Sequence, residues 1–159
     1  MNELPPEFDL RAYLLGGPAR LVPGTWVVER GLLDRAAGTR GTFAGVVRFS
    51  PTPDGGLALR EEGTMCWPSF VGPASREYLL RPAGRADALD VFFPDGRPFH
   101  RMGFAPEANA ASHWCDPDAY RVAYTYENAD RFSYTWDITG PRKDLELASR
   151  LHRSQGTDA

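Results

Sequence analysis

The segment Gly24-Thr25-Trp26 places a glycine and a tryptophan where the first β-strand of the chain is expected to begin. Glycine allows the tight backbone turn that leads into a strand. The tryptophan gives that strand a side chain large enough to plug one end of a barrel. Most of the chain that follows alternates between strand-like runs and turn signals. Together these features predict a closed antiparallel barrel with an internal cavity, a fold suited to holding a small molecule.

The strand-like runs are short and are separated by turns rich in glycine, proline and aspartate, the clearest being Pro51–Gly56 and Pro94–Arg97. We predict an all-β, single antiparallel up-and-down barrel of about nine to ten strands. A short helix over Pro5–Gly17 would cap one end. Residues 1–153 form the expected single domain, and 154–159 a disordered tail. The expected strands are Thr25–Leu33, Gly41–Ser50, Leu57–Trp67, Ser75–Arg81, Ala88–Phe93, Pro98–Phe104, Ala110–Trp114, Tyr120–Glu127, Phe132–Ile138 and Asp144–Arg153.

The charge balance of the chain argues against some partners. Eighteen basic and twenty-one acidic residues give a net charge of −3, without the concentrated basic surface that nucleic acids or anionic membranes attract. The first residues do not resemble a signal peptide, and no apolar run is long enough for a membrane span. Cys66 and Cys115 could form one disulfide, but reduced thiols are the better interpretation. We expect a cytoplasmic monomer or homodimer.

Charged residues in the middle of strands favour a barrel over a sandwich, because they fall on both faces of the alternation. A sandwich would have to pair any charge that it buried. The lumen of a ligand-binding barrel can hold water or a polar ligand beside such groups. In the alternative, all these charges face solvent and the lumen is packed solid. The residues concerned are Arg30, Arg60, Glu61, Glu62, Arg76, Glu77, Arg101 and Glu146.

The Gly24-x-Trp26 motif resembles the calycin superfamily, which includes lipocalins, fatty-acid-binding proteins and the nitrobindin-like haem barrels. The resemblance implies a calycin-like fold, with a basic residue of the last strand packed over the tryptophan; Arg150 or Arg153 could fill that role. Four further stretches resemble an uncharacterised family of small bacterial proteins that is known only as a domain of unknown function. They are Arg60–Gly63, Asp95–His100, His113–Tyr120 and Trp136–Asp144. This resemblance covers nearly the whole chain and implies no established reaction.

The densest group of reactive side chains lies around His113 and Cys115, which would project from the same face of an extended strand. Asp118 and Tyr120 follow a proline-containing turn and could converge on the same rim. Histidine, thiol and carboxylate could activate a nucleophile or bind zinc. The alternative is a polar corner with no function.

His100 follows the Pro94–Arg97 turn, and alternation places it with Met102 and Phe104, opposite Phe99. If that face lines the lumen, His100 could ligate a haem iron or act as a general base. It could equally be a hydrogen-bonded core residue.

The run Arg60-Glu61-Glu62 puts a carboxylate on each face of a strand, so one of the two glutamates must point inward in a closed barrel. A buried glutamate needs a cation. Such a pair could orient a polar ligand head, act as an acid–base couple or have no function. The candidate partners are Arg30, Arg76 and Arg101.

Aromatic residues alternate along two neighbouring strands and would form a wall that suits a flat, partly polar ligand. Cross-strand pairing in an ordinary core explains the same pattern. The residues are Tyr120, Tyr124, Tyr126, Phe132, Tyr134 and Trp136.

The first function predicted from these patterns is binding of a small, largely apolar or aromatic molecule in the lumen. Its expected ligand-binding residues are Trp26, Arg30, Arg60, Glu61, Arg76, Met102, Tyr124, Tyr134 and Trp136. The second is an isomerase, cyclase or hydrolase acting through acid–base groups. Its expected catalytic residues are His100, His113, Asp118, Tyr120 and Glu62. The third is a haem barrel with His100 or His113 as the proximal ligand; no other metal site is predicted.

Overall fold

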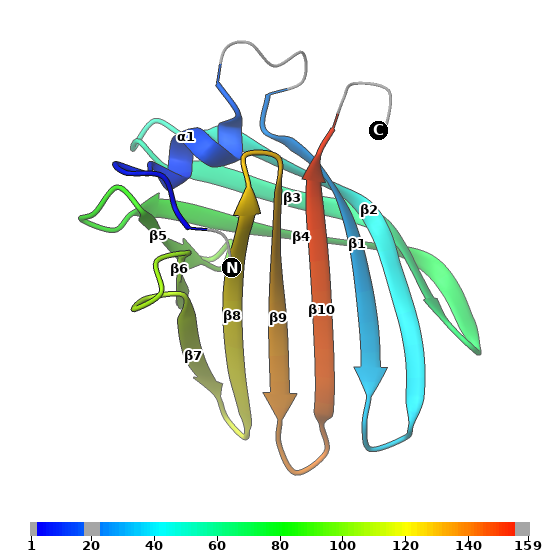
Figure 1. The fold of residues 1–159 in the computed structure, drawn as a ribbon. Coiled ribbons are helices and arrows are strands. Elements are labelled where there is room, and N and C mark those ends of the chain that lie inside the picture. Colours follow the sequence, from blue (N-terminus) through cyan, green and yellow to red (C-terminus); the bar gives the residue numbers. More distant parts are fainter. Residues whose placement is uncertain (1–2, 18–22, 155–159) are drawn as a thin grey trace.

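The computed structural model of the protein describes residues 3–17 and 23–154 (Figure 1). These residues form one short helix and a single antiparallel sheet of ten strands. The helix is α1 (Leu10–Leu15), and the strands are β1 (Thr25–Asp34), β2 (Thr39–Pro51), β3 (Leu57–Trp67), β4 (Phe70–Pro82), β5 (Ala88–Phe92), β6 (Pro98–Gly103), β7 (Ala110–Cys115), β8 (Asp118–Asn128), β9 (Arg131–Thr139) and β10 (Asp144–Arg153).

The sheet curls into a nearly closed barrel. β1 pairs with β2 on one side and with β10 on the other, so the last strand meets the first. The strand order is β6-β5-β4-β3-β2-β1-β10-β9-β8-β7, which leaves β6 and β7 as the two edges. The gap between these edges, termed the seam, has no strand ladder among the described residues. The prediction of an all-β antiparallel barrel is confirmed.

Side chains and a connecting loop cover the seam. The rings of Phe99 on β6 and His113 on β7 lie 5.1 Å apart across it. The loop between β6 and β7 also returns to the sheet, where the carbonyl of Asn109 accepts from the amide of Tyr124 at 2.9 Å. The side-chain amide of Asn109 donates to the carbonyl of Tyr124 at 3.0 Å. The seam is therefore bridged without a continuous strand pair.

Most strands begin and end near the expected residues, and the bounds of β3 and β10 are as predicted. The largest difference is in β4, which begins at Phe70 and not at Ser75. Its ladder with β3 continues to the pair Trp67 and Phe70. Gly72 and Pro73 in this stretch are typical of a turn, but the hairpin holds both in extended pairing.

Helix α1 is shorter than the predicted Pro5–Gly17, because a different backbone precedes it. Glu7 has a left-handed φ of 56°, which a helix does not accommodate. Asp9 is the N-cap, and its carboxylate accepts a backbone amide of the first turn at 2.9 Å. Gly16, with φ of 84°, ends the helix as expected.

Helix α1 covers one end of the barrel, here termed the closed end (Figure 1). Trp26 lies at this end, against the helix. Its side chain is fully buried, and the indole N–H donates to the carbonyl of Leu14 at 2.9 Å. The guanidinium of Arg153 lies 4.3 Å from the centre of the Trp26 ring. Arg150, the other candidate for this position, is exposed and pairs with Glu29 at 3.6 Å. The basic residue over the tryptophan is therefore Arg153.

Gly24 is required by the approach of two backbone segments at the closed end. Its φ is +74°, and a Cβ there would lie 2.0 Å from the carbonyl oxygen of Phe49. The amide of Phe49 donates to the carbonyl of Gly24 at 2.7 Å, and the amide of Gly24 donates to Leu15 at 2.8 Å. The glycine of the Gly-x-Trp motif thus joins α1 to the barrel.

Ser154, the first residue of the expected tail, is buried, and its amide donates to the carbonyl of Thr25 at 3.0 Å. The rest of that tail, residues 155–159, lies outside the described residues. Cys66 and Cys115 are exposed free thiols. Over residues 3–17 and 23–154, no helix combines the length and apolar character needed to cross a membrane.

Candidate functional site

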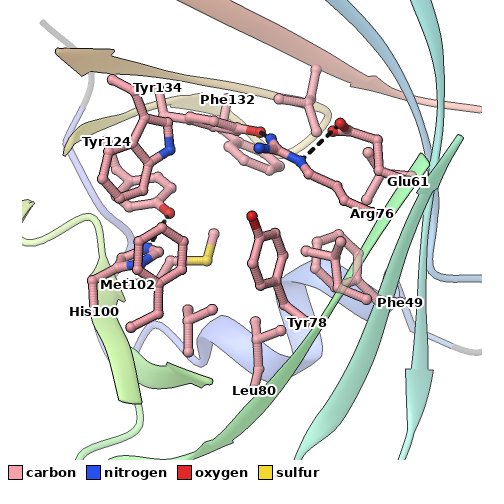
Figure 2. A pocket seen from close by; sticks show the side chains of 16 residues that line it. Phe49, Glu61, Arg76, Tyr78, Leu80, His100, Met102, Tyr124, Phe132 and Tyr134 are labelled. Carbon is pink, nitrogen blue, oxygen red and sulfur yellow. Dashed lines mark hydrogen bonds and ion pairs between the residues drawn. The ribbon is translucent and has the colours of Figure 1, made fainter. Parts of the chain in front are cut away.

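A cavity lies inside the barrel, and sixteen side chains from β2–β6 and β8–β10 line it (Figure 2). The space open to the centres of water molecules is about 40 Å³, which is room for roughly three waters. The lumen is therefore hollow but narrow. The apolar lining residues are Val47, Phe49, Leu59, Leu80, Val91, Phe99, Met102, Phe132, Trp136 and Leu151, and the polar ones are Glu61, Arg76, Tyr78, His100, Tyr124 and Tyr134.

One side of the cavity, termed the charged end, is built around Glu61. Alternation along β3 turns this carboxylate inward, opposite Arg76 in the ladder with β4. The guanidinium of Arg30 donates to both carboxylate oxygens, at 2.8 and 2.7 Å. Arg76 Nε lies 2.9 Å from Glu61 Oε1, close enough for an ion pair, but its N–H direction misses hydrogen-bond geometry. Two guanidiniums therefore share one carboxylate.

Arg30 stands behind Glu61 and does not line the cavity. Its side chain is buried, and its Nε donates to the hydroxyl of Ser149 at 2.6 Å. Its Nη2 also donates to the hydroxyl of Tyr134 at 2.9 Å. The ring of Phe43 lies 5.0 Å from the guanidinium carbon. These contacts hold Arg30 in one position and orient the carboxylate toward the lumen.

The charge state of Glu61 follows from competing effects on its pKa. Burial raises the pKa, but the hydrogen bonds from Arg30 and the charges of Arg76 and Arg30 outweigh burial and hold the pKa below its ordinary value. Glu61 is therefore ionised at neutral pH. Because both arginines keep their protons, the charged end carries one net positive charge.

The other side of the cavity, termed the neutral end, contains His100 and Tyr124. His100 Nε2 and the hydroxyl of Tyr124 are 2.8 Å apart. Burial, together with the smaller effects of the charges of His113 and Arg76, lowers the pKa of His100 to about 3. Burial also raises the pKa of Tyr124 well above its ordinary value. Both side chains are neutral at neutral pH, and the buried Nδ1 of His100 has no hydrogen-bond partner among the described residues.

Phe99 also lines the cavity, although strict alternation from His100 predicts that it faces outward. The register of β5 and β6 shifts there, with Val91 opposite His100 and Phe92 opposite Pro98. Phe99 is the extra residue of this β-bulge, and it turns inward beside His100. Its ring stacks on Trp136 at 5.1 Å and 7°.

The sequence model of a family described as a family of unknown function, DUF6314, matches residues 22–153. The chain belongs to the DUF6314 family. No curated protein matches it.

Solved structures resemble this DUF6314 chain in fold. The S-type phycobiliprotein lyase of Guillardia theta matches with a TM-score of 0.54 and 11% identity, over 82% of this chain and 86% of the lyase. A protein of unknown function from the DUF3598 family of Nostoc punctiforme matches with a TM-score of 0.56 and 8% identity. That match covers 82% of this chain but 46% of the Nostoc protein, so the chain spans about half its length. At such identities the likeness concerns the fold alone.

The DUF6314 chain brings many of the predicted site residues together. Glu61, Arg76 and Tyr134 line the charged end, and His100 and Tyr124 line the neutral end. Among the apolar lining residues are two more that the sequence predicts, Met102 and Trp136.

Outside the group around His113, four predicted site residues do not line the cavity, and the first of them is Arg30, which stands behind Glu61. Trp26 packs in the closed end and does not line the cavity. Arg60 and Glu62 flank Glu61 on β3, so alternation turns both to the outer surface, where they form an ion pair at 3.3 Å. We therefore correct their assignment to the lumen. Arg101, a candidate partner for the buried glutamate, also faces outward and pairs with Asp90 at 2.9 Å.

The predicted cluster around His113 does not converge on one point. Asp118 pairs with Lys143 at 3.3 Å. His113 packs its ring against Phe99 and lies 6.1 Å from the ring of Tyr120, centre to centre. Within the described part of the chain, no hydrogen bond joins these three predicted residues to one another, and no group of three or more histidine, cysteine or acidic side chains could hold a metal ion. The predicted catalytic set is therefore dispersed: His100 lines the cavity, His113 lies at the seam, Glu62 faces outward, and Asp118 is buried at the start of β8.

The cavity also does not fit a haem. His100 Nε2 is already engaged by Tyr124, and the hollow has room for a few waters and not for a porphyrin ring. His113 lies against the ring of Phe93 at 5.8 Å and does not line the hollow.

The sequence analysis missed Tyr78, whose hydroxyl points into the cavity (Figure 2). The signal was present, because Tyr78 follows Arg76 by two residues on the same strand and must share its face. The same alternation along β2 also turns Val47 and Phe49 toward the cavity.

Proposed function

We propose that this protein binds a small, largely apolar or aromatic molecule in the lumen of its barrel. The cavity carries this proposal, because it is lined mostly by apolar side chains and has polar groups gathered at two places. Ligand sites in proteins combine these features, with the polar groups fixing the orientation of an apolar body. The fold is shared with a phycobiliprotein lyase, but at 11% identity the proposal rests on the cavity and not on that likeness.

The small volume of the hollow sets a condition on binding. A ligand larger than a few waters requires the walls to move. Met102 is an unbranched, flexible side chain that can repack around a guest. The seam offers a way in, because β6 and β7 can separate without breaking a strand ladder.

A catalytic role has less support than binding. The acid–base residues do not meet around the cavity, and a histidine whose pKa is about 3 is a weak base at neutral pH. The partner that we propose is therefore a small molecule. We also propose that the protein is a cytoplasmic monomer or homodimer and that Cys66 and Cys115 are reduced thiols.

Titration of the isotope-labelled protein with indole, an uncharged aromatic probe, tests the proposal by NMR. Indole is expected to shift the side-chain signals of Leu80, Val91 and Met102, which line the cavity. Leu80→Phe fills the hollow and should weaken this binding. Leu79→Phe adds the same ring to the next residue of β4, outside the cavity lining, and should not. Shifts confined to the outer surface, or no saturable binding of indole, would contradict the proposal.

A further inference from the structure

The charged end of the cavity holds more positive charge than its own residues balance. Arg30 and Arg76 are both cationic, and Glu61 is the one carboxylate that contacts either of them among the described residues. Arg30 uses both of its terminal nitrogens on Glu61. The unbalanced charge is therefore that of Arg76, which lines the cavity and whose side chain is 32% exposed. Removing charge from water without a counter-charge is costly, so this arrangement favours a guest that brings a negative one.

Hydrogen-bond donors at the same place are also in excess. The hydroxyl of Tyr134 accepts from Arg30 at 2.9 Å and from Arg76 at 3.3 Å, which leaves its own proton to donate. Among the described residues, the one hydrogen bond that Arg76 donates with ordinary geometry runs from Nη2 to Tyr134, beside the ion pair of its Nε with Glu61.

Tyr78 adds a third donor directed at the same space. Its hydroxyl points into the hollow (Figure 2), and it makes no hydrogen bond within the described ranges that meets ordinary geometry. Its ring lies under Arg76, with the guanidinium carbon 5.5 Å from the ring centre. Burial raises the pKa of Tyr78, so the hydroxyl keeps its proton at neutral pH. Three donors of β4 and β9 therefore border the hollow without an acceptor.

We infer that the charged end binds the carboxylate of a small organic acid, held by the guanidinium of Arg76 and the hydroxyls of Tyr78 and Tyr134. This inference rests on the proposed function, since the rest of the acid occupies the apolar part of the lumen. A monoanion matches the single net positive charge, whereas a phosphate dianion would exceed it. The planar guanidinium fork also suits a carboxylate, with which it can form two parallel hydrogen bonds.

Two pairs of isosteric probes test the inference by calorimetric titration at pH 7: benzoate with benzamide, and butanoate with butanamide. Each acid is expected to bind on the order of tenfold to a hundredfold more tightly than its amide, because a hydrogen bond to a charged group outweighs one to a neutral group. Arg76→Gln should remove this preference. Arg81→Gln, which removes an exposed arginine of the same strand outside the cavity lining, should retain it.

The outcomes separate this inference from the proposed function. Equal binding of acids and amides, or a preference for acids that survives Arg76→Gln, would overturn the carboxylate site and leave lumen binding intact. Failure of all four probes and of indole would overturn both. If Arg76→Gln does not fold, the guanidinium ¹⁵N signals of Arg76 in the unmodified protein decide the matter. They should shift with benzoate and not with indole, and unchanged signals in saturating benzoate would overturn the inference.

Discussion

The two ends of the cavity bury polar groups in opposite ways. At the charged end, Glu61 stays ionised because Arg30 and Arg76 surround it. At the neutral end, His100 and Tyr124 hydrogen-bond to each other and carry no charge. The first solution depends on counter-charges and leaves donors to spare, whereas the second depends on avoiding charge. The cavity therefore has a positively charged side, which attracts anions and lies at β3 and β4, and an uncharged side opposite.

The largest effect is expected at the carboxylate of the charged end. Glu61→Gln leaves Arg30 buried without a counter-charge, and should lower the free energy of unfolding by about 3–5 kcal/mol. Glu62→Gln changes the neighbouring residue on the outer surface, where its ion pair with Arg48 is exposed, and should cost less than about 1 kcal/mol. Urea unfolding of the two variants measures the difference. Similar losses in both would mean that the charged end is not a buried ion cluster.

The neutral end predicts a pH dependence of stability. The pKa of His100 falls from an ordinary 6.5 to about 3 on folding, so below pH 6.5 the unfolded chain binds a proton that the folded protein does not. The contribution of His100 to the free energy of unfolding is therefore fully present above pH 6.5 and is lost as the pH falls toward 3. Between pH 7 and pH 5 the loss should be about 2 kcal/mol.

His100→Gln, which cannot titrate, should lack this part of the pH dependence. Urea unfolding of both proteins at pH 7 and pH 5 gives the comparison, and the effects of other titrating groups cancel in the difference. If both proteins lose the same free energy of unfolding between pH 7 and pH 5, His100 accepts a proton in the folded state, and this end of the cavity is not neutral at pH 5.

A smaller effect is expected from the partner hydroxyl. Tyr124→Phe leaves His100 Nε2 buried without a hydrogen bond and should cost about 1–2 kcal/mol at pH 7. Tyr126→Phe removes the hydroxyl of a half-buried tyrosine on the same strand, which forms no hydrogen bond with the described residues, and should be nearly neutral. Thermal unfolding of the two variants compares them. Equal shifts in Tm would indicate that the pair at the neutral end contributes no net stability.

The smallest effect on stability is expected at Arg76. Arg76→Gln leaves the two hydrogen bonds between Arg30 and Glu61 in place and removes the unbalanced charge, so the free energy of unfolding should change by less than about 1 kcal/mol. A loss as large as that of Glu61→Gln would show that Arg76 is part of the structural cluster and not a group held ready for a ligand.

Local alternation allows much of the barrel and one side of the site to be predicted. In Arg60-Glu61-Glu62 the two-residue period requires the middle side chain to face opposite to its neighbours, and the structure places Glu61 inside. The same rule gives Tyr124 and Tyr134 on the inner wall. Which of several arginines meets Glu61 depends on strand neighbours distant in the chain, and no local pattern contains that information.

The rest of the site depends on departures from regular alternation. Phe99 faces the cavity because a bulge shifts the register of β6, which a strict two-residue period places outside. The cluster around His113 looks compact in the sequence, yet the hairpin from β7 to β8 sends its members to different surroundings. Closeness along the chain is thus a poor guide where a turn intervenes.

The pairing of β1 with β10 puts the first and last strands side by side, while the discontinuity of the sheet falls in the middle of the chain. A circular permutant that starts at β7 and ends at β6, with a new link from β10 to β1, would follow the sheet in unbroken neighbour order. Its chain ends would then flank the seam, so that tethering or freeing them tests whether the seam is the entrance that we propose.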